Sequence, residues 1–255
     1  MTSRAAAAIL SAREGRRILL PLGPASPADV AAGYAAQREV AEALGAVPPA
    51  GFKIGATTKQ MQAYLGLAGP AAGFVAREGL QRSPGSFRFD DLIAPGVECE
   101  VGLRLGHDLP AGPCTREQAA AAVAEVFAAI EIVEKRYTDL AELGTPALIA
   151  DQVFHRAGVL GAPAAGWRDA DLGAIRGRMT VDGALRGEGA GADLLGHPFE
   201  ALAWLAASPG AAVFGGLKAG QVVFLGSVTP PIWLDGPCHV VVEFDLLGRA
   251  EARFD

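Results

Sequence analysis

Residues 97–103 place two acidic side chains inside an apolar segment, Val97-Glu98-Cys99-Glu100-Val101-Gly102-Leu103. Side chains alternate along an extended strand, so Glu98 and Glu100 are expected to project from the same face. Two like charges on one face repel each other unless water or a cation neutralises them. The spacing fits two ligands of a buried cation, but taken alone it favours the solvated face of an edge strand.

Glu131 is a third acid in similar surroundings, because Ala128-Ala129-Ile130 precedes it and Ile132-Val133 follows it. Three carboxylates on apolar strands would supply the oxygen ligands that Mg²⁺ or Mn²⁺ prefers. However, Glu134-Lys135-Arg136 indicates that this strand soon reaches water. From the residues alone, both the metal site and the solvated face remain open.

The bulk composition excludes several classes of protein. The chain has 255 residues, 51% of them hydrophobic, and a formal net charge of −6. This predicts a folded protein with neither a nucleic-acid groove nor an anionic-membrane surface. No apolar run reaches the ~18 residues of a membrane helix, and the first residues make a poor signal peptide. The three cysteines lack C-x-x-C spacing, so we expect reduced thiols in a cytoplasmic protein.

The order of predicted elements favours an α+β fold. Helices are expected over 3–15 and from Ser26-Pro27 to Leu44, and a capping box at Thr115 predicts an Ala-rich helix leading to Phe127. Strands are expected at 51–55, 93–105, 130–137 and 221–226, with a hairpin of 238–244 and 249–254. We expect residues 1–50 to form a helical region packed on a β-rich catalytic unit, 51–255.

Several segments share their order and spacing with a known family. They are Gly51-Phe52-Lys53-Ile54-Gly55-Ala56-Thr57 with Met61-Gln62, Glu98-Cys99-Glu100 ending in Asp108-Leu109-Pro110, Ala129-Ile130-Glu131-Ile132-Val133 with Arg136, Ile149-Ala150-Asp151, Gly196-His197-Pro198, and Leu217-Lys218-Ala219-Gly220-Gln221. From about Pro48 to the C-terminus the chain resembles the hydratase/decarboxylase branch of the fumarylacetoacetate hydrolase superfamily. The N-terminal helices match more loosely.

The resemblance implies both a fold and an activity. It implies a mixed β-roll core of the fumarylacetoacetate hydrolase C-terminal-domain type with N-terminal helices, in a homodimer or a larger homo-oligomer. It also implies that Glu98, Glu100 and Glu131 hold Mg²⁺ or Mn²⁺, and that Lys53 lies at the active site. The expected activity is that of a divalent-metal-dependent lyase of aromatic-compound catabolism. Its substrate would be a small 2-oxo or 2-hydroxydienoic acid, as for a 2-keto-4-pentenoate hydratase.

Further residues are candidates for substrate contacts. Lys53 could pair with a substrate carboxylate or move a proton, although its position alone also fits a surface lysine. We expect Arg136 and Asp151, which lie in matching segments, to bind substrate. Ser227 could donate to a substrate carboxylate, but a strand-end turn would explain it equally well.

The chain departs from the family pattern at three places, one of which is Leu225, where relatives often carry threonine before the glycine. Ala71 stands where hydratases carry an acid thought to work with the lysine, and a methyl group cannot move a proton. The bulky Phe154 stands where a small residue is expected. A decarboxylase of the 4-oxalocrotonate type and a catalytically degenerate binding or assembly subunit are therefore alternatives. His155 or His197 could supply a proton, although each also fits a structural or capping role.

Overall fold

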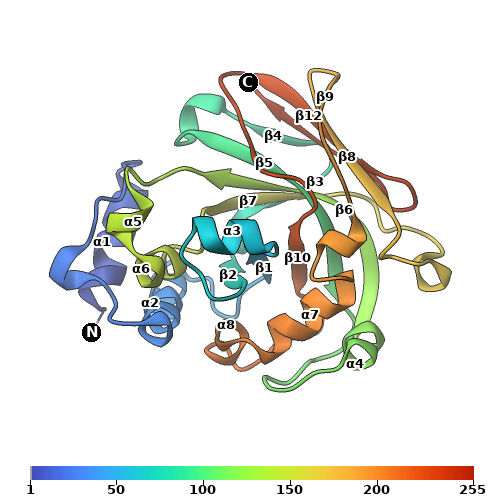
Figure 1. Ribbon diagram of the computed structural model, residues 1–255. Helices are drawn as coiled ribbons and strands as arrows, with labels where there is room; N and C mark the ends of the chain where they lie inside the picture. The colour runs from blue at the N-terminus through green and yellow to red at the C-terminus, as the bar shows by residue number, and fades with distance from the viewer. Residues whose placement is uncertain (1) are drawn as a thin grey trace.

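The computed structural model describes residues 2–255, which form two sheets and a set of short helices (Figure 1). The larger sheet contains β1 (Gly51–Gly55), β2 (Ala71–Val75), β3 (Leu80–Arg82), β5 (Pro95–Leu105), β6 (Val123–Glu134), β7 (His155–Leu160), β10 (Val222–Ser227) and β11 (Ile232–Trp233). Its strand order is β2-β1-β10-β5-β6-β7-β3, with β11 paired to β5 outside this path. β5 therefore lies in the middle of the sheet.

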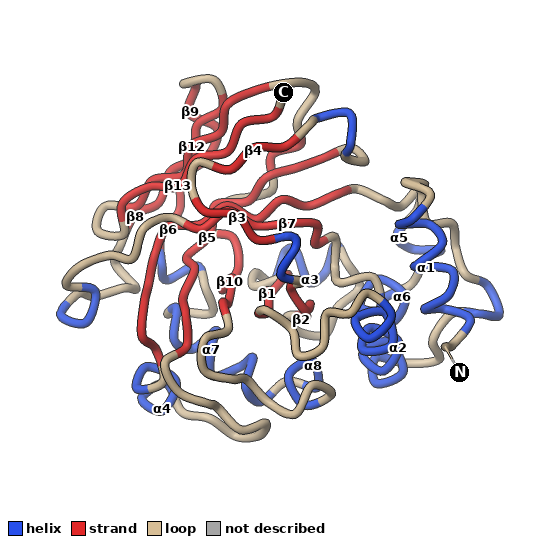
Figure 2. Tube along the Cα trace, turned by 180° about the vertical axis from the view of Figure 1, so that it is seen from behind, coloured by secondary structure: helices blue, strands red, loops and turns tan. Residues whose placement is uncertain are grey.

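The second sheet has the order β4-β13-β12-β8-β9. Its strands are β4 (Gly85–Phe87), β8 (Arg176–Val181), β9 (Ala184–Ala190), β12 (Cys238–Phe244) and β13 (Gly248–Phe254). The antiparallel pairing of β12 with β13 confirms the predicted C-terminal hairpin. Seen from behind, this sheet lies above the larger one, at the end of the molecule where the chain terminates (Figure 2).

Apart from α3 (Lys59–Tyr64), which follows β1, the helices lie in two groups around the larger sheet. These groups consist of α1 (Arg4–Glu14), α2 (Val30–Ala43), α4 (Arg116–Ala121), α5 (Leu140–Leu143), α6 (Thr145–Ala150), α7 (Pro198–Ala207) and α8 (Pro209–Ala212). Both views place α1, α2, α5 and α6 together at one side, and α4, α7 and α8 below the sheet (Figures 1 and 2). The predicted α+β architecture with N-terminal helices is confirmed. Within residues 2–255, no helix is both long and apolar enough to span a membrane.

Two predicted helix boundaries are wrong. α2 begins at Val30 rather than near Ser26, because Asp29 is the residue that caps it, accepting a hydrogen bond from the Ala32 N–H at 2.8 Å. The helix expected to reach Phe127 ends at Ala121, and β6 already begins at Val123. Antiparallel pairing of this segment with β5 outweighs its helical propensity.

The larger sheet curls so that its ends approach each other. A Cβ added at Gly73 of β2 would lie 2.9 Å from the carbonyl oxygen of Gln152, just before β7. A separate apolar cluster, distinct from the main core, fills part of the concave side and consists of Val75, Phe127, Ala129, Leu160, Val222 and Phe224. A Cβ at Gly158 would lie 2.1 Å from Phe224 Cζ, so the missing side chain makes room for this ring. The cluster forms an apolar base beneath Glu98 and Glu100, which lie on the same face of β5.

Candidate active site

Three glutamates meet on the concave face of the curled sheet. Glu98 and Glu100 project from the same face of β5, and Glu131 on β6 lies directly opposite Glu98. One carboxylate oxygen from each residue lies within 4.8 Å of the others. Glu100 and Glu131 have no exposed surface, and β5 is flanked by β10 and β6. The alternative of a solvated edge strand is therefore wrong.

Crowding of the carboxylates changes their protonation. Burial and the neighbouring charge of Glu131 raise the pKa of Glu98 to about 8. Burial, Glu131 and Glu98 together raise the pKa of Glu100. Burial alone would also raise the pKa of Glu131, but Lys53 and His155 hold it below its ordinary value. Without a cation, the cluster therefore retains protons at neutral pH.

Lys53 and His155 share one oxygen of Glu131. Lys53 Nζ lies 3.2 Å from Glu131 Oε1, and His155 Nδ1 lies 2.8 Å from the same atom. The Lys53 side chain is only 2% exposed, so its interpretation as a surface lysine is wrong. Burial lowers the pKa of His155 despite its contact with Glu131. Sequence reasoning considered His155 as a proton donor but did not place it against Glu131.

The carboxylate oxygens of the cluster that accept no hydrogen bond fit a divalent cation. Glu100 Oε2 accepts a hydrogen bond from the Gly226 N–H at 2.7 Å. Glu100 Oε1 and Glu131 Oε2 are buried and have no hydrogen-bond partner among the described residues. Buried carboxylate oxygens are normally satisfied, and hard cations such as Mg²⁺ and Mn²⁺ prefer oxygen donors of this kind. The donor set therefore suits such an ion.

Ala71 lies on the same face of the sheet as Lys53. β1 pairs with β2 so that Lys53 is opposite Gly73 and Gly55 is opposite Ala71. Ala71 is thus the diagonal neighbour of Lys53 on the concave side, and it is completely buried. A carboxylate at this position would face the lysine, whereas the methyl group of Ala71 offers no proton.

Arg136 and Asp151 belong to a buried ion-pair network. Asp151 Oδ1 accepts from Arg13 Nε at 2.7 Å, and Oδ2 accepts from Arg136 Nε at 3.0 Å and from the Tyr137 hydroxyl at 2.7 Å. Burial alone would raise the pKa of Asp151, but the two guanidinium groups hold it below its ordinary value. Arg136 also pairs with Glu134 at 2.9 Å. The network thus already uses the polar atoms of Arg136 and Asp151. The substrate contacts expected of these two residues stay predictions.

Ser227 lies beside Glu100, its register partner across β10 and β5. Its Oγ accepts from the Cys99 N–H at 3.1 Å and donates to the Cys99 carbonyl at 3.3 Å. The hydroxyl thus joins the two strands at the bulge in β10, which agrees with a strand-end role. A substrate contact for Ser227 also stays a prediction. His197 caps α7 by accepting from the Phe199 N–H, in agreement with the capping interpretation.

A left-handed turn connects Asp151 to β7. Gln152, Val153 and Phe154 have φ values of 61°, 50° and 69°. Each such residue costs roughly 1–2 kcal/mol in this conformation unless its surroundings compensate. Here Gln152 Nε2 donates to the Phe74 carbonyl at 2.6 Å, and the turn delivers His155 to Glu131. Neither glycine nor asparagine marks the turn in the sequence, so sequence reasoning missed it.

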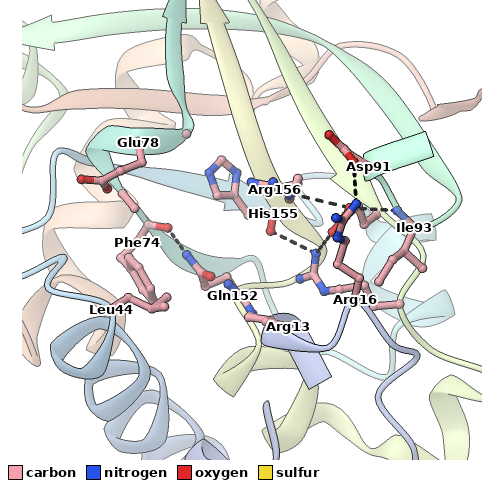
Figure 3. Close-up of a pocket in the computed structure, with 14 residues that line it drawn as sticks. Arg13, Arg16, Leu44, Phe74, Glu78, Asp91, Ile93, Gln152, His155 and Arg156 are labelled. Atoms are coloured by element: carbon pink, nitrogen blue, oxygen red, sulfur yellow. Dashed lines mark hydrogen bonds and ion pairs between the residues drawn. The ribbon is translucent and has the colours of Figure 1, made fainter. Parts of the chain in front are cut away.

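A cavity of about 320 Å³ lies on the other side of His155 (Figure 3). Its charged lining residues are Arg13, Arg16, Glu78, Asp91, Glu134, Arg136 and Arg156. Arg16 pairs with Asp91, and Arg136 with Glu134. The cavity is therefore an ion-paired space next to the helices. His155 lies between it and the carboxylate cluster.

Comparison with known proteins identifies the class. Residues 35–255 match the model of the fumarylacetoacetate (FAA) hydrolase C-terminal family, and the chain belongs to this family, in its hydratase/decarboxylase branch. It is 30% identical to 2-keto-4-pentenoate hydratase of Paraburkholderia phymatum over 98% of this chain and 95% of that protein. It is 35% identical to 2-hydroxyhexa-2,4-dienoate hydratase of Comamonas testosteroni over 71% of this chain and 68% of that protein.

A solved structure confirms the fold. The structure of 4-oxalocrotonate decarboxylase from Pseudomonas putida G7, complexed with magnesium and adipate, superimposes with a TM-score of 0.90. The match has 25% sequence identity and covers 100% of this chain and 97% of that one. The predicted family and the predicted fold type are thus both confirmed.

Proposed function

We propose that the protein is a divalent-metal-dependent lyase that acts on a small 2-oxo or 2-hydroxydienoic acid, as 2-keto-4-pentenoate hydratases do. The observation that supports this most directly is the cluster of Glu98, Glu100 and Glu131 with Lys53 held against it. The three glutamates would hold Mg²⁺ or Mn²⁺, which supplies the positive charge that polarises the keto oxygen of such an acid.

The protein side chains supply the remaining chemistry. Lys53 is buried beside the cluster, where its ammonium group can hold the substrate carboxylate or move a proton at Nζ. His155 donates from Nδ1 to Glu131 and keeps this carboxylate oriented, which leaves Glu131 Oε2 for the cation. The apolar base around Phe224 excludes water from beneath the site.

Decarboxylation of a 2-oxo acid of the 4-oxalocrotonate type is the second candidate, and Ala71 favours it. Hydration needs a group that delivers water and a proton, and the position diagonal to Lys53 carries only a methyl group. Loss of carbon dioxide makes less demand on a separate acid, because the released electron pair moves onto the keto oxygen of the substrate, where a cation held by the glutamates would stabilise the negative charge.

Two assays with the Mg²⁺-loaded protein test these functions. Loss of absorbance of 2-hydroxypenta-2,4-dienoate supports the hydratase, and carbon dioxide release from 4-oxalocrotonate supports the decarboxylase. Glu98→Gln and Glu100→Gln should abolish either reaction. If metal binds but neither substrate reacts, the lyase proposal is wrong, and the chain is a binding or assembly subunit.

We also propose that residues 1–50 act as a helical region packed on the catalytic unit 51–255. Arg13 of α1 pairs with Asp151 at 2.5 Å, and Gln37 of α2 donates to the carbonyls of Ala72 and Ile149, which supports this packing. A homo-oligomer in the cytoplasm is part of the same proposal. Light scattering of the purified chain tests the oligomer.

A further inference from the structure

We infer that Phe154 and Trp233 form an aromatic wall that selects among 2-oxo acids. The selected feature is the end of the substrate opposite its 2-oxo acid group. The wall favours an uncharged alkyl or aryl end over a second carboxylate. This inference rests on the proposed hydratase function and adds the class of substituent that the site accepts. It opposes the 4-oxalocrotonate candidate, whose substrate carries a carboxylate at both ends.

Trp233 lies on the concave face next to the carboxylates. β11 pairs with β5 so that Trp233 is opposite Gly96, two residues before Glu98 on the same face. A Cβ at Gly96 would lie 2.7 Å from Trp233 Cε3, so the indole covers this position of β5. Trp233 is 39% exposed, whereas Glu100 is completely buried. The indole therefore lies on the open side of the cluster.

The left-handed turn adds the rest of the wall. The Phe154 ring lies 6.4 Å from the Trp233 ring and 5.1 Å from the Tyr137 ring, measured between centroids. Val153 Cγ1 and Lys53 Nζ lie 3.1 Å and 3.2 Å from the position that a Cβ would take at Gly55, so both face the same space. The turn thus places the apolar side chains of Val153 and Phe154 along the space between Lys53 and Trp233.

The aromatic wall offers no partner to a second carboxylate. Aromatic faces carry negative partial charge, and an anion pressed against them loses its water without gaining a partner. Arg136 lies 6.0 Å from the Tyr137 ring, but Glu134 and Asp151 already pair with it. An alkyl or aryl end, by contrast, gains from burial against the rings.

Binding of two acids of equal length to the Mn²⁺-loaded protein tests the inference. 2-Oxohexanoate and 2-oxoadipate differ only in the terminal methyl or carboxylate, and pyruvate reports on the shared 2-oxo acid group. By calorimetry, 2-oxohexanoate should bind at least about tenfold more tightly than 2-oxoadipate. Trp233→Ala and Phe154→Asn should each reduce this preference to about threefold or less and leave pyruvate binding unchanged. Asparagine tolerates the left-handed conformation of residue 154.

Leu246→Ala is the matched control, because this exposed apolar residue lies between β12 and β13. It should leave the preference unchanged. If 2-oxoadipate binds as tightly as 2-oxohexanoate, or if the preference survives both wall substitutions, the aromatic wall does not select and the inference is wrong. In that case binding of pyruvate still supports the proposed function. Failure of all three acids to bind the metal-loaded protein contradicts the proposed function itself.

Discussion

Binding of Mn²⁺ to the metal-free protein at pH 7 should release about one proton or more per ion. With a pKa of about 8, Glu98 is about 90% protonated at this pH, and a carboxylate must be ionised to bind the cation. Glu100 adds to the release, because burial and its two acidic neighbours also raise its pKa. At pH 9 the contribution of Glu98 falls to about 0.1 proton. Metal affinity should therefore rise from pH 7 to pH 8.

Calorimetric titration in two buffers with different heats of ionisation counts these protons. Glu98→Gln should remove about 0.9 proton at pH 7 and flatten the dependence on pH. A release that stays near zero at pH 7 while Mn²⁺ still binds would show that the carboxylates are already ionised, and would refute the reasoning from burial and mutual repulsion.

The same pKa predicts how stability varies with pH. Between the ordinary value of 4.5 and about 8, folded metal-free protein keeps a proton on Glu98 that the unfolded chain has released. Stability must therefore fall as pH rises through this window. Thermal unfolding with a chelator at pH 5.5 and pH 8 measures this fall. Saturating Mn²⁺ should raise the midpoint more at pH 8, and an equal rise at both pH values would contradict the linkage.

Three further substitutions separate catalysis from folding. Lys53→Ala should lower turnover about 100- to 10,000-fold and leave Mn²⁺ binding within a few-fold of wild type; loss of both would instead indicate a damaged site. Asp151→Asn should lower the free energy of unfolding in urea by about 3–5 kcal/mol at pH 7, because buried guanidinium groups lose their counter-charge. Because its folded pKa lies below the ordinary 3.8, Asp151 stabilises wild type above that pH, and the difference should shrink as pH falls through the folded value. Gly226→Ala should cost about 1–3 kcal/mol, since φ is +113° and the new Cβ would lie 2.4 Å from Thr57 Cγ2. It should also weaken Mn²⁺ binding because the Gly226 N–H holds Glu100, and unchanged affinity would rule out that role.

Local features of this protein could be predicted from its sequence. The alternation around Glu98 and Glu100 placed both side chains on one face, because strand geometry depends on adjacent residues alone. The capping box at Thr115 and the β12–β13 hairpin were predicted for the same reason. The apolar surroundings of Glu131 made it a third candidate, and the family resemblance added Lys53. The structure brings all four residues together.

Only the tertiary structure decided what surrounds the carboxylates. The register of β5 against β6 brings Glu131 opposite Glu98, and pairing with β5 converts Val123–Phe127 from a predicted helix into strand. Arg13 meets Asp151 across 138 residues of sequence. The left-handed turn at residues 152–154 contains no glycine or asparagine that would predict it from the sequence. These features depend on contacts between distant segments, whose energies outweigh local propensity and leave no periodic trace in the sequence.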